Sequence, residues 1–379
     1  MSCERPEPPA SPDDLELLRA HRPWLQYSQD PFRICSARTI VDTQGNALHR
    51  VDGPPLRAGA GLSLEALSPD ARPDAYLDAT GFSQLEPPAL QDDPRYAPRV
   101  YGRVVRGLRG GCWLQYWFWL YFNQKRLLGF GAHQGDWEMI QIHLGRGGRP
   151  TRVTFAQHDY GDARRWGRGM VIDDSDGTER IVVFVAPFSH ASYYRPGTKF
   201  YAGGTDSPDA LGPRLLPEVE PFGAWASWPG RWGATRGWRG TSPAGPPCQG
   251  AKWTQPARYH RLSLSLKLWQ KGLKGLWIGG HLTYPRCPRI EARIEGNVLR
   301  GEVAKSGIFR RGRHVYLTAH ALDDRRLVAG PRIVRNIRAA HRFELDLRAP
   351  VDRCCVHATA YNVWRQTSDP GSCEAVRAA

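Results

Sequence analysis

Residues 131–144 have the sequence "GAHQGDWEMIQIHL", in which polar and apolar residues alternate. Because side chains two residues apart point to the same face of a β-strand, the two carboxylates of this stretch lie on a face that is otherwise apolar. That face consists of Asp136, Glu138, Ile140, Ile142 and Leu144. The stretch therefore predicts a strand that directs two carboxylates toward a core.

The segments around this strand have a similar character and predict a mainly β fold. Further strands are expected at residues 99–107, 112–122, 152–161 and 179–194. The segment 112–122 is apolar on both faces, which places it in the middle of a sheet covered on both sides. Short strands joined by tight turns predict an antiparallel β-sandwich domain with long Trp/Gly/Pro loops. A short helix is expected at 13–23, where Pro23 ends it.

A second domain is indicated after residue 284. Strands there recur at intervals typical of a small immunoglobulin- or fibronectin-type-III-like β-sandwich. We predict a disordered tail at 1–12, the first sandwich at 13–260, an amphipathic linker at 261–283, the second sandwich at 284–368 and a tail at 369–379. Wound as a helix, residues 262–277 collect their lysines on one face, which predicts either a solvated linker helix or a helix that contacts a membrane surface.

The composition bounds the possible partners and the compartment. The chain of 379 residues has 52 Lys and Arg against 37 Asp and Glu, a formal charge of +15. The Arg residues are scattered and no nucleic-acid motif is present, which argues against a nucleic-acid partner. The eight cysteines form no CxxC pair, the N-terminus lacks the apolar core of a secretory signal, and the apolar run 113–122 is too short to span a bilayer. We therefore expect a cytoplasmic protein with reduced thiols.

Two buried carboxylates on one face repel each other and lose hydration, so something must compensate them. A divalent cation, an arginine or one shared proton would each do so. His133 lies three residues before Asp136 and can turn toward the same place. With Asp136 and Glu138 it offers a ligand set that suits Ca²⁺, Mg²⁺, Mn²⁺ or Zn²⁺. A structural network of carboxylates and arginines is the alternative.

Other residues are candidates for catalysis or ligand binding. His158 and His190 terminate neighbouring strands and are candidate general bases for a metal-bound water. Trp225, Trp228 and Trp232 lie in a Gly- and Pro-rich loop, where indoles either line a ligand groove by stacking or anchor the loop in the core.

Several motifs occur in an order that resembles the vacuolar protein sorting-associated protein 62 family. The match runs over residues 18–255 and includes "WLQYWFWLYFN", "GAHQGDWEMIQI", "VAPFSHASYYRPGT" and the later "GRWG" and "SPAGP". Gln134 stands where the family usually has Glu. The family name reflects a sorting phenotype and implies no particular reaction.

The same stretch more faintly resembles the signature GHRHDWE of the secreted necrosis-inducing cytolysins. That resemblance implies a β-sandwich that holds a divalent metal and serves membrane glycolipid recognition. His133, Asp136 and Glu138 correspond to the first His, the Asp and the Glu, whereas Gly135 replaces the second His and Ala132 the Gly. Together these observations favour a divalent-metal-containing binding protein for lipid headgroups or glycans. The alternative is a metal-dependent hydrolase with His158 or His190 as base.

Overall fold

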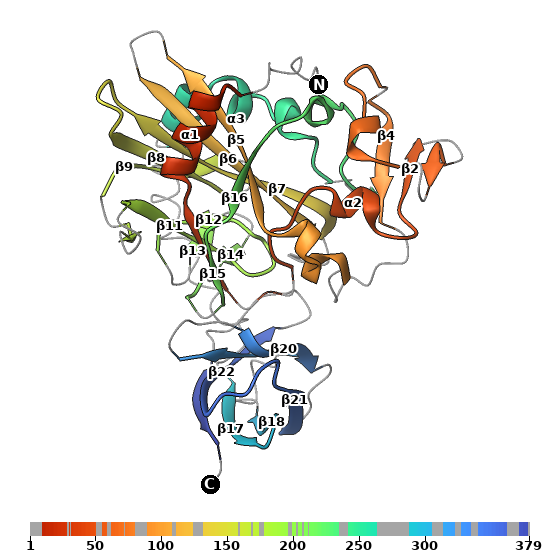
Figure 1. Ribbon diagram of the computed structural model, residues 1–379, viewed down its shortest axis with the longest axis vertical. Coiled ribbons are helices and arrows are strands. Elements are labelled where there is room, and N and C mark those ends of the chain that lie inside the picture. Colours follow the sequence, from red (N-terminus) through yellow and green to blue (C-terminus); the bar gives the residue numbers. More distant parts are fainter. Residues whose placement is uncertain are drawn as a thin grey trace.

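The chain contains two β-rich parts, which Figure 1 draws as a larger lobe and a smaller, blue C-terminal lobe. The computed structural model describes residues 10–28, 30, 32–50, 55–58, 62–71, 73–79, 89–107, 111–123, 132–157, 160–167, 170–173, 178–195, 199–201, 204–206, 208–210, 212–234, 242–263, 288–304, 314–322, 327–334, 340–361 and 371–377.

A six-stranded sheet lies at the centre of the larger lobe and contains the strand predicted from residues 131–144 (Figure 1). Its spatial order is β16 (Glu218–Pro221), β5 (Arg99–Arg106), β6 (Cys112–Asn123), β7 (His133–Leu144), β8 (Pro150–Gln157) and β9 (Tyr160–Arg165). Neighbours from β5 to β9 pair antiparallel, as the tight turns predict. Strand β6 is buried along nearly its whole length, in agreement with its apolar sequence.

A second sheet packs on one face of the first and makes the domain a sandwich. Its strands are β10 (Ile172–Asp173), β11 (Arg180–Val185), β1 (Trp24–Tyr27) and β15 (Arg214–Leu215), with β12 (Ser192–Tyr193) paired to β11. Side chains of β1 and β11 share one apolar core with those of β6, β7 and β8. The predicted mainly β sandwich fold is confirmed. The pairs β1–β11 and β16–β5 are parallel, however, and join segments too distant in sequence for turn signals to reveal.

Loops and short elements cover the opposite face of the six-stranded sheet. The core on this side contains the indoles of Trp117, Trp119 and Trp137. The elements of the lobe outside the two sheets are α2 (Thr39–Asp42), β2 (Ala47–Arg50), β3 (Arg57–Ala58), η2 (Leu64–Ala66), β4 (Ala75–Asp78), η3 (Ala89–Asp92), η4 (Pro94–Tyr96), β13 (Lys199–Tyr201), β14 (Gly204–Asp206), η5 (Ala224–Ser227), η6 (Pro246–Cys248) and α3 (Ala251–Thr254). Residues 53–98 thus contribute short strands and helical turns to this layer.

Helix α1 (Pro12–His21) confirms the predicted short helix. Its N-terminus is capped by Ser11, whose hydroxyl accepts the backbone N–H of Asp14 at 3.1 Å. At the C-terminus the buried Arg180 donates to the backbone carbonyls of Arg19 and Ala20 at 3.0 and 2.7 Å, which ties α1 to β11.

Residues 288–377 form a second sandwich. The expected tail at 369–379 is wrong, because residues 371–376 form a strand that pairs with residues 353–358 in this sandwich. One sheet has the order β17 (Arg289–Glu295), β18 (Val298–Ala304) and β21 (His341–Asp346). The other has the order β20 (Leu327–Val334), β19 (His314–Ala321), β22 (Arg353–Tyr361) and β23 (Gly371–Val376). Apolar residues from both sheets make one core.

The cysteines and the linker differ in part from expectation. Cys248 forms a disulfide bond, whereas Cys35, Cys112, Cys354, Cys355 and Cys373 are free thiols. One oxidised cysteine contradicts the expectation that all thiols are reduced, because spacing along the chain does not reveal which cysteines meet in space. Residues 256–263 are helical, and residues 264–277 of the predicted amphipathic segment lie outside the described residues. No helix in the described part of the chain is long and apolar enough to cross a membrane.

Candidate functional site

Strand β7 directs its two faces as the sequence predicts. Ile140, Ile142 and Leu144 enter the core between the two sheets, and Trp137 and Met139 enter the core on the other side. Asp136 and Glu138 are each 6% exposed. Both carboxylates are therefore buried at the edge of the sandwich core.

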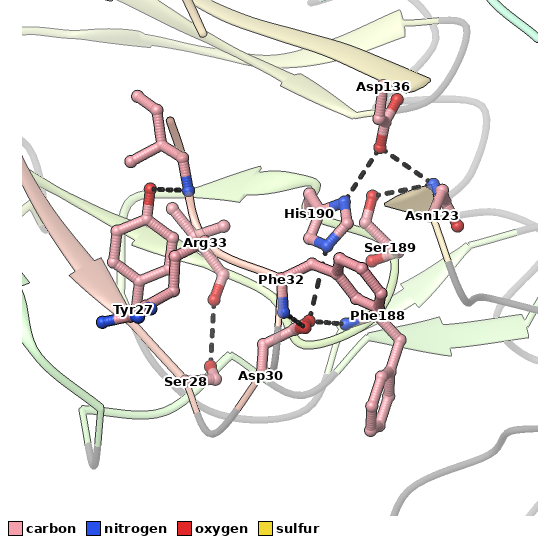
Figure 2. A network of polar contacts seen from close by, with 12 residues as sticks. Tyr27, Ser28, Asp30, Phe32, Arg33, Asn123, Asp136, Phe188, Ser189 and His190 are labelled. Carbon is pink, nitrogen blue, oxygen red and sulfur yellow. Dashed lines mark hydrogen bonds and ion pairs between the residues drawn. The ribbon is translucent and has the colours of Figure 1, made fainter. Parts of the chain in front are cut away.

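Asp136 is paired with a histidine rather than an arginine. His190 donates from Nδ1 to Asp136 Oδ2 at 3.0 Å, and Asn123 donates from Nδ2 to the same oxygen at 2.9 Å. On its other side His190 Nε2 lies 3.4 Å from Asp30 Oδ2, an ion pair without hydrogen-bond alignment. Figure 2 shows the imidazole between the two carboxylates. The fully buried ring thus bridges Asp30 and Asp136.

The loop that carries His190 has an unusual backbone. Phe188 and His190 adopt φ angles of 67° and 56°, in the left-handed region that non-glycine residues rarely occupy. The Phe188 N–H donates to Asp30, and the Ser189 hydroxyl donates to Asp206 Oδ1 at 2.7 Å. Such a conformation persists only where surrounding contacts hold it. Asp30 therefore positions both the loop and the imidazole.

The charges in this network follow from its contacts. Burial alone lowers the pKa of His190, but the contacts with Asp136 and Asp30 outweigh burial and raise that pKa to about 10. Burial raises the pKa of Asp136, yet the hydrogen bond from His190 and the nearby His133 lower it overall. At neutral pH the pair is therefore an imidazolium and a carboxylate. The buried charge of Asp136 is therefore compensated by His190.

Glu138 is not compensated in the same way. Its Oε2 is buried and has no hydrogen-bond partner among the described residues. Burial, followed by the charge of Asp136, raises the pKa of Glu138 well above its ordinary value. Asp136 Oδ1 likewise accepts no hydrogen bond from the described part of the chain. Glu138 therefore keeps a buried oxygen atom without a donor among the described residues.

The residues before Asp136 belong to the strand and not to a loop. His133 Nδ1 lies 2.7 Å from the Gly135 carbonyl oxygen. Because a carbonyl only accepts, Nδ1 carries a proton, and Nε2 is the ring nitrogen left to contact another group. The Gln134 side-chain oxygen accepts the backbone N–H groups of Ala79 and Ala234, both at 2.9 Å. Gln134 thus clamps two segments, a structural role.

The three indoles predicted to line a ligand groove are part of the core. Trp225, Trp228 and Trp232 are 5%, 1% and 0% exposed. Trp232 packs against Trp119 and Trp137 with ring centroids 5.2 and 5.3 Å apart. An indole without an exposed face cannot stack on a ligand from solvent. The structure therefore supports the alternative, in which these residues anchor the loop.

The structure gathers only some of the predicted site residues. Asp136, Glu138 and His190 lie together, and His133 is close enough to influence the pKa of Asp136. His158 lies outside the described residues. His190 as a general base stays a prediction. Its contacts with two carboxylates raise its pKa, so at neutral pH the ring is protonated and has no lone pair to accept a proton. Asp30 and Asn123 were missed as site residues. Asn123 ends the motif "WLQYWFWLYFN", whereas none of the quoted motifs contains Asp30.

The stability of the protein should depend on pH through His190. A histidine in the unfolded chain has an ordinary pKa of 6.5, against about 10 in the folded protein. The stabilisation is therefore complete below the lower pKa and is lost as pH rises through the higher one. We expect the stability advantage of the parent over His190→Gln to shrink from pH 7 to pH 10 in urea unfolding. A constant difference would contradict the raised pKa of His190.

Comparisons with known proteins give a structural likeness only. No family model matches the chain, and no curated protein matches it. Among solved structures, NLPPya in complex with mannosamine matches at 15% identity and a TM-score of 0.29, over 58% of this chain and 91% of that one. A structure titled "Toxin fold for microbial attack and plant defense" matches at 16% identity and a TM-score of 0.28, over 57% and 89%.

The resemblances to the vacuolar sorting family and to the cytolysins both stay predictions from the sequence. Likenesses at such scores carry no argument about function.

Proposed function

We propose that the first sandwich is a binding module that holds a divalent cation at Asp136 and Glu138 and uses it to recognise glycans or lipid headgroups. The observation that carries the proposal is the buried Glu138 Oε2, which lacks a donor beside the ionised Asp136. A buried acceptor without a partner costs about 1 to 3 kcal/mol. A cation would remove that penalty and offset the repulsion between the two groups.

The other ways of compensating the pair are less well supported. No arginine among the described residues pairs with Asp136 or Glu138, and the one imidazolium in contact with Asp136 is shared with Asp30. A proton on Glu138 would neutralise its charge. With or without that proton, Oε2 would still have no hydrogen-bond partner among the described residues, so protonation alone does not complete the site.

The donor chemistry fits a hard cation with water in its shell. Asp136 and Glu138 offer carboxylate oxygens, and Mg²⁺ is commonly bound through one or two carboxylates plus water. His133 is a candidate third ligand, because its Nδ1–H is already held by a backbone carbonyl, as in many metal-ligating histidines. No group of three such side chains in the described part of the chain is spaced as a ready metal site. The proposal is therefore a site whose shell is partly water or ligand.

Binding is favoured over hydrolysis because His190, the candidate base that the structure describes, is held as an imidazolium between two carboxylates. A bound cation would supply a positive centre for hydroxyl or phosphate oxygens. His190 stays protonated and holds Asp136 in place, and Asn123 fixes the same carboxylate from the other side. These residues hold the Asp136 carboxylate in the orientation in which it would bind the cation, and they transfer no proton.

Glu138→Gln tests the proposal with little change of shape. Without divalent ions, the variant should unfold at the same temperature as the parent or higher, because glutamine resembles the protonated acid. With Mg²⁺, Ca²⁺, Mn²⁺ or Zn²⁺ at about 100 times the dissociation constant, the parent should gain about 2.7 kcal/mol and the variant almost nothing. Thermal unfolding with each ion against EDTA is the measurement.

A matched control is Glu220→Gln, which removes a carboxylate bonded to Arg99 at 2.7 Å on the distant β16. It should keep the full response to the cation. A parent protein that no divalent ion stabilises would refute the proposal, as would a Glu138→Gln variant that responds like the parent.

A further inference from the structure

The end of the six-stranded sheet farthest from Asp136 carries a row of basic residues. In register across β7, β8 and β9, His143 pairs with Arg152 and Arg152 pairs with Arg165. Directly opposite residues of antiparallel strands point to the same face. Seven residues separate Asp136 from His143, about 23 Å along a strand. This row is therefore a surface distinct from the carboxylate site.

The helical segment 251–263 covers the sheet up to this row and leaves the row itself open. Gln141 donates to the Pro256 carbonyl at 2.8 Å, and Thr154 bonds His260 Nδ1 at 2.8 Å. Thr154 is two residues from Arg152 and shares its face. Arg152 and Arg165 are both exposed. The basic row thus forms a ledge beside the end of the helix.

The charges of the ledge are not balanced nearby. Arg149, Arg152 and Arg165 are exposed and make no ion pair with any described residue. Like charges placed directly opposite across strands are destabilising, so Arg152 and Arg165 have an electrostatic reason to bind an anion. Burial and the neighbouring Arg152 lower the pKa of His143. Burial, with Arg152, His143 and Arg261, lowers that of His260 to about 4, so the positive charge of Arg152 is felt at both imidazoles.

The solvent-facing side of the adjacent helix continues the ledge. Arg258, Arg261 and Leu262 are spaced to share one helical face, and all three are exposed. Leu262 is 44% exposed, one of few large apolar side chains so open among the described residues. Guanidinium groups beside an accessible aliphatic side chain are the composition of a surface that rests on lipid headgroups.

We propose that Arg149, Arg152 and Arg165, with Arg258 and Arg261 of the adjoining helix, form a cationic ledge that docks on membranes rich in anionic lipids. The phosphate oxygens of the headgroups are the ligands of the guanidinium groups. Nucleic acid would offer the same phosphates, but the aromatic rings on this face are buried. Trp113 is 6% and His260 4% exposed, so these two rings are not open to stacking on bases.

Vesicle sedimentation in the presence of EDTA tests whether the ledge binds lipid, because EDTA removes divalent cations and so keeps the proposed cation site empty. Vesicles of phosphatidylcholine with phosphatidylserine should pellet the full-length protein at about 0.05 M salt and much less at about 0.5 M. The triple variant Arg149→Gln, Arg152→Gln, Arg165→Gln should bind about a hundredfold more weakly, since each basic residue near such a surface contributes roughly fivefold. All three side chains are exposed, so thermal unfolding of the variant should match that of the parent.

The control removes the same charge elsewhere. Arg289→Gln, Arg342→Gln and Arg353→Gln change exposed residues of the second sandwich and should leave vesicle binding within twofold of the parent. Equal losses in both triple variants would overturn the ledge, as would equal pelleting with pure phosphatidylcholine. Binding to a DNA oligonucleotide without binding to the anionic vesicles would overturn the lipid assignment.

Discussion

Replacing His190 by glutamine should destabilise the protein by about 3 to 5 kcal/mol at neutral pH, the usual consequence of breaking a buried ion pair. The side chain is fully buried between Asp136 Oδ2 at 3.0 Å and Asp30 Oδ2 at 3.4 Å. Without the imidazolium, two buried carboxylates face each other with no positive charge between them. Urea unfolding followed by tryptophan fluorescence measures the loss.

His143→Gln is the matched control for this prediction. His143 is half-buried, contacts the Thr151 hydroxyl at 2.6 Å and has a lowered pKa through burial and Arg152. It is neutral at pH 7, so its replacement should change stability by less than about 1 kcal/mol. Similar losses in the two variants would mean that packing, and not charge, explains the role of His190.

Gly135→Ala should destabilise the protein at least as much as His190→Gln does. We expect the free energy of unfolding to fall by about 3 to 5 kcal/mol, or the variant to fail to fold. Gly135 has a φ of +65°, and a Cβ there would lie 1.9 Å from the Trp232 carbonyl oxygen and 2.5 Å from the Trp119 ring. Both neighbours belong to the aromatic core, which has little room to move. The glycine lets the start of β7 approach the Trp-rich loop immediately before Asp136.

Gly148→Ala separates backbone strain from collision. Gly148 has a φ of +72°, but a Cβ there would meet nothing within 4 Å. Gly148→Ala should therefore lower the free energy of unfolding only by the cost of placing alanine in the left-handed conformation, about 1 to 2 kcal/mol. Equal stability of the two alanine variants would mean that glycine is required at position 135 for a reason other than close packing against Trp232.

The alternation of polar and apolar residues was enough to predict β7 and its two faces, because it decides which side chains enter the core. It also predicted the two sandwiches and α1. Residues 133–135 belong to β7 although Gly135 and its neighbours have the composition of a loop. Their strand conformation depends on pairing with β6, where Asn123 lies opposite His133.

The partners of the carboxylates were beyond the reach of local patterns. His190 is 54 residues from Asp136, and Asp30 comes from a segment near the N-terminus. The sequence left a cation, an arginine and a shared proton open as compensation for the pair. In the fold, His190 compensates Asp136, and the long-range packing of β1 and β11 brings this about. The burial of Glu138 remains uncompensated among the described residues, and the proposed cation would compensate it.

The Trp-rich loop shows a different limit of sequence reasoning. Composition alone did not decide between a ligand groove and an anchored loop. The fold decides for the anchor, because the second face of β6 and β7 needs cover and the indoles of Trp225, Trp228 and Trp232 supply it. Residue type was informative there, but the direction of each ring depended on tertiary packing.

The most direct test is anomalous diffraction from crystals of the full-length protein grown with Mn²⁺. The account predicts one anomalous peak about 2.0 to 2.6 Å from carboxylate oxygens of both Asp136 and Glu138, absent from crystals of Glu138→Gln. A map without a peak there, in which Glu138 Oε2 accepts a hydrogen bond from water or from the protein, would contradict it. The carboxylate pair would then belong to the architecture of the sandwich alone.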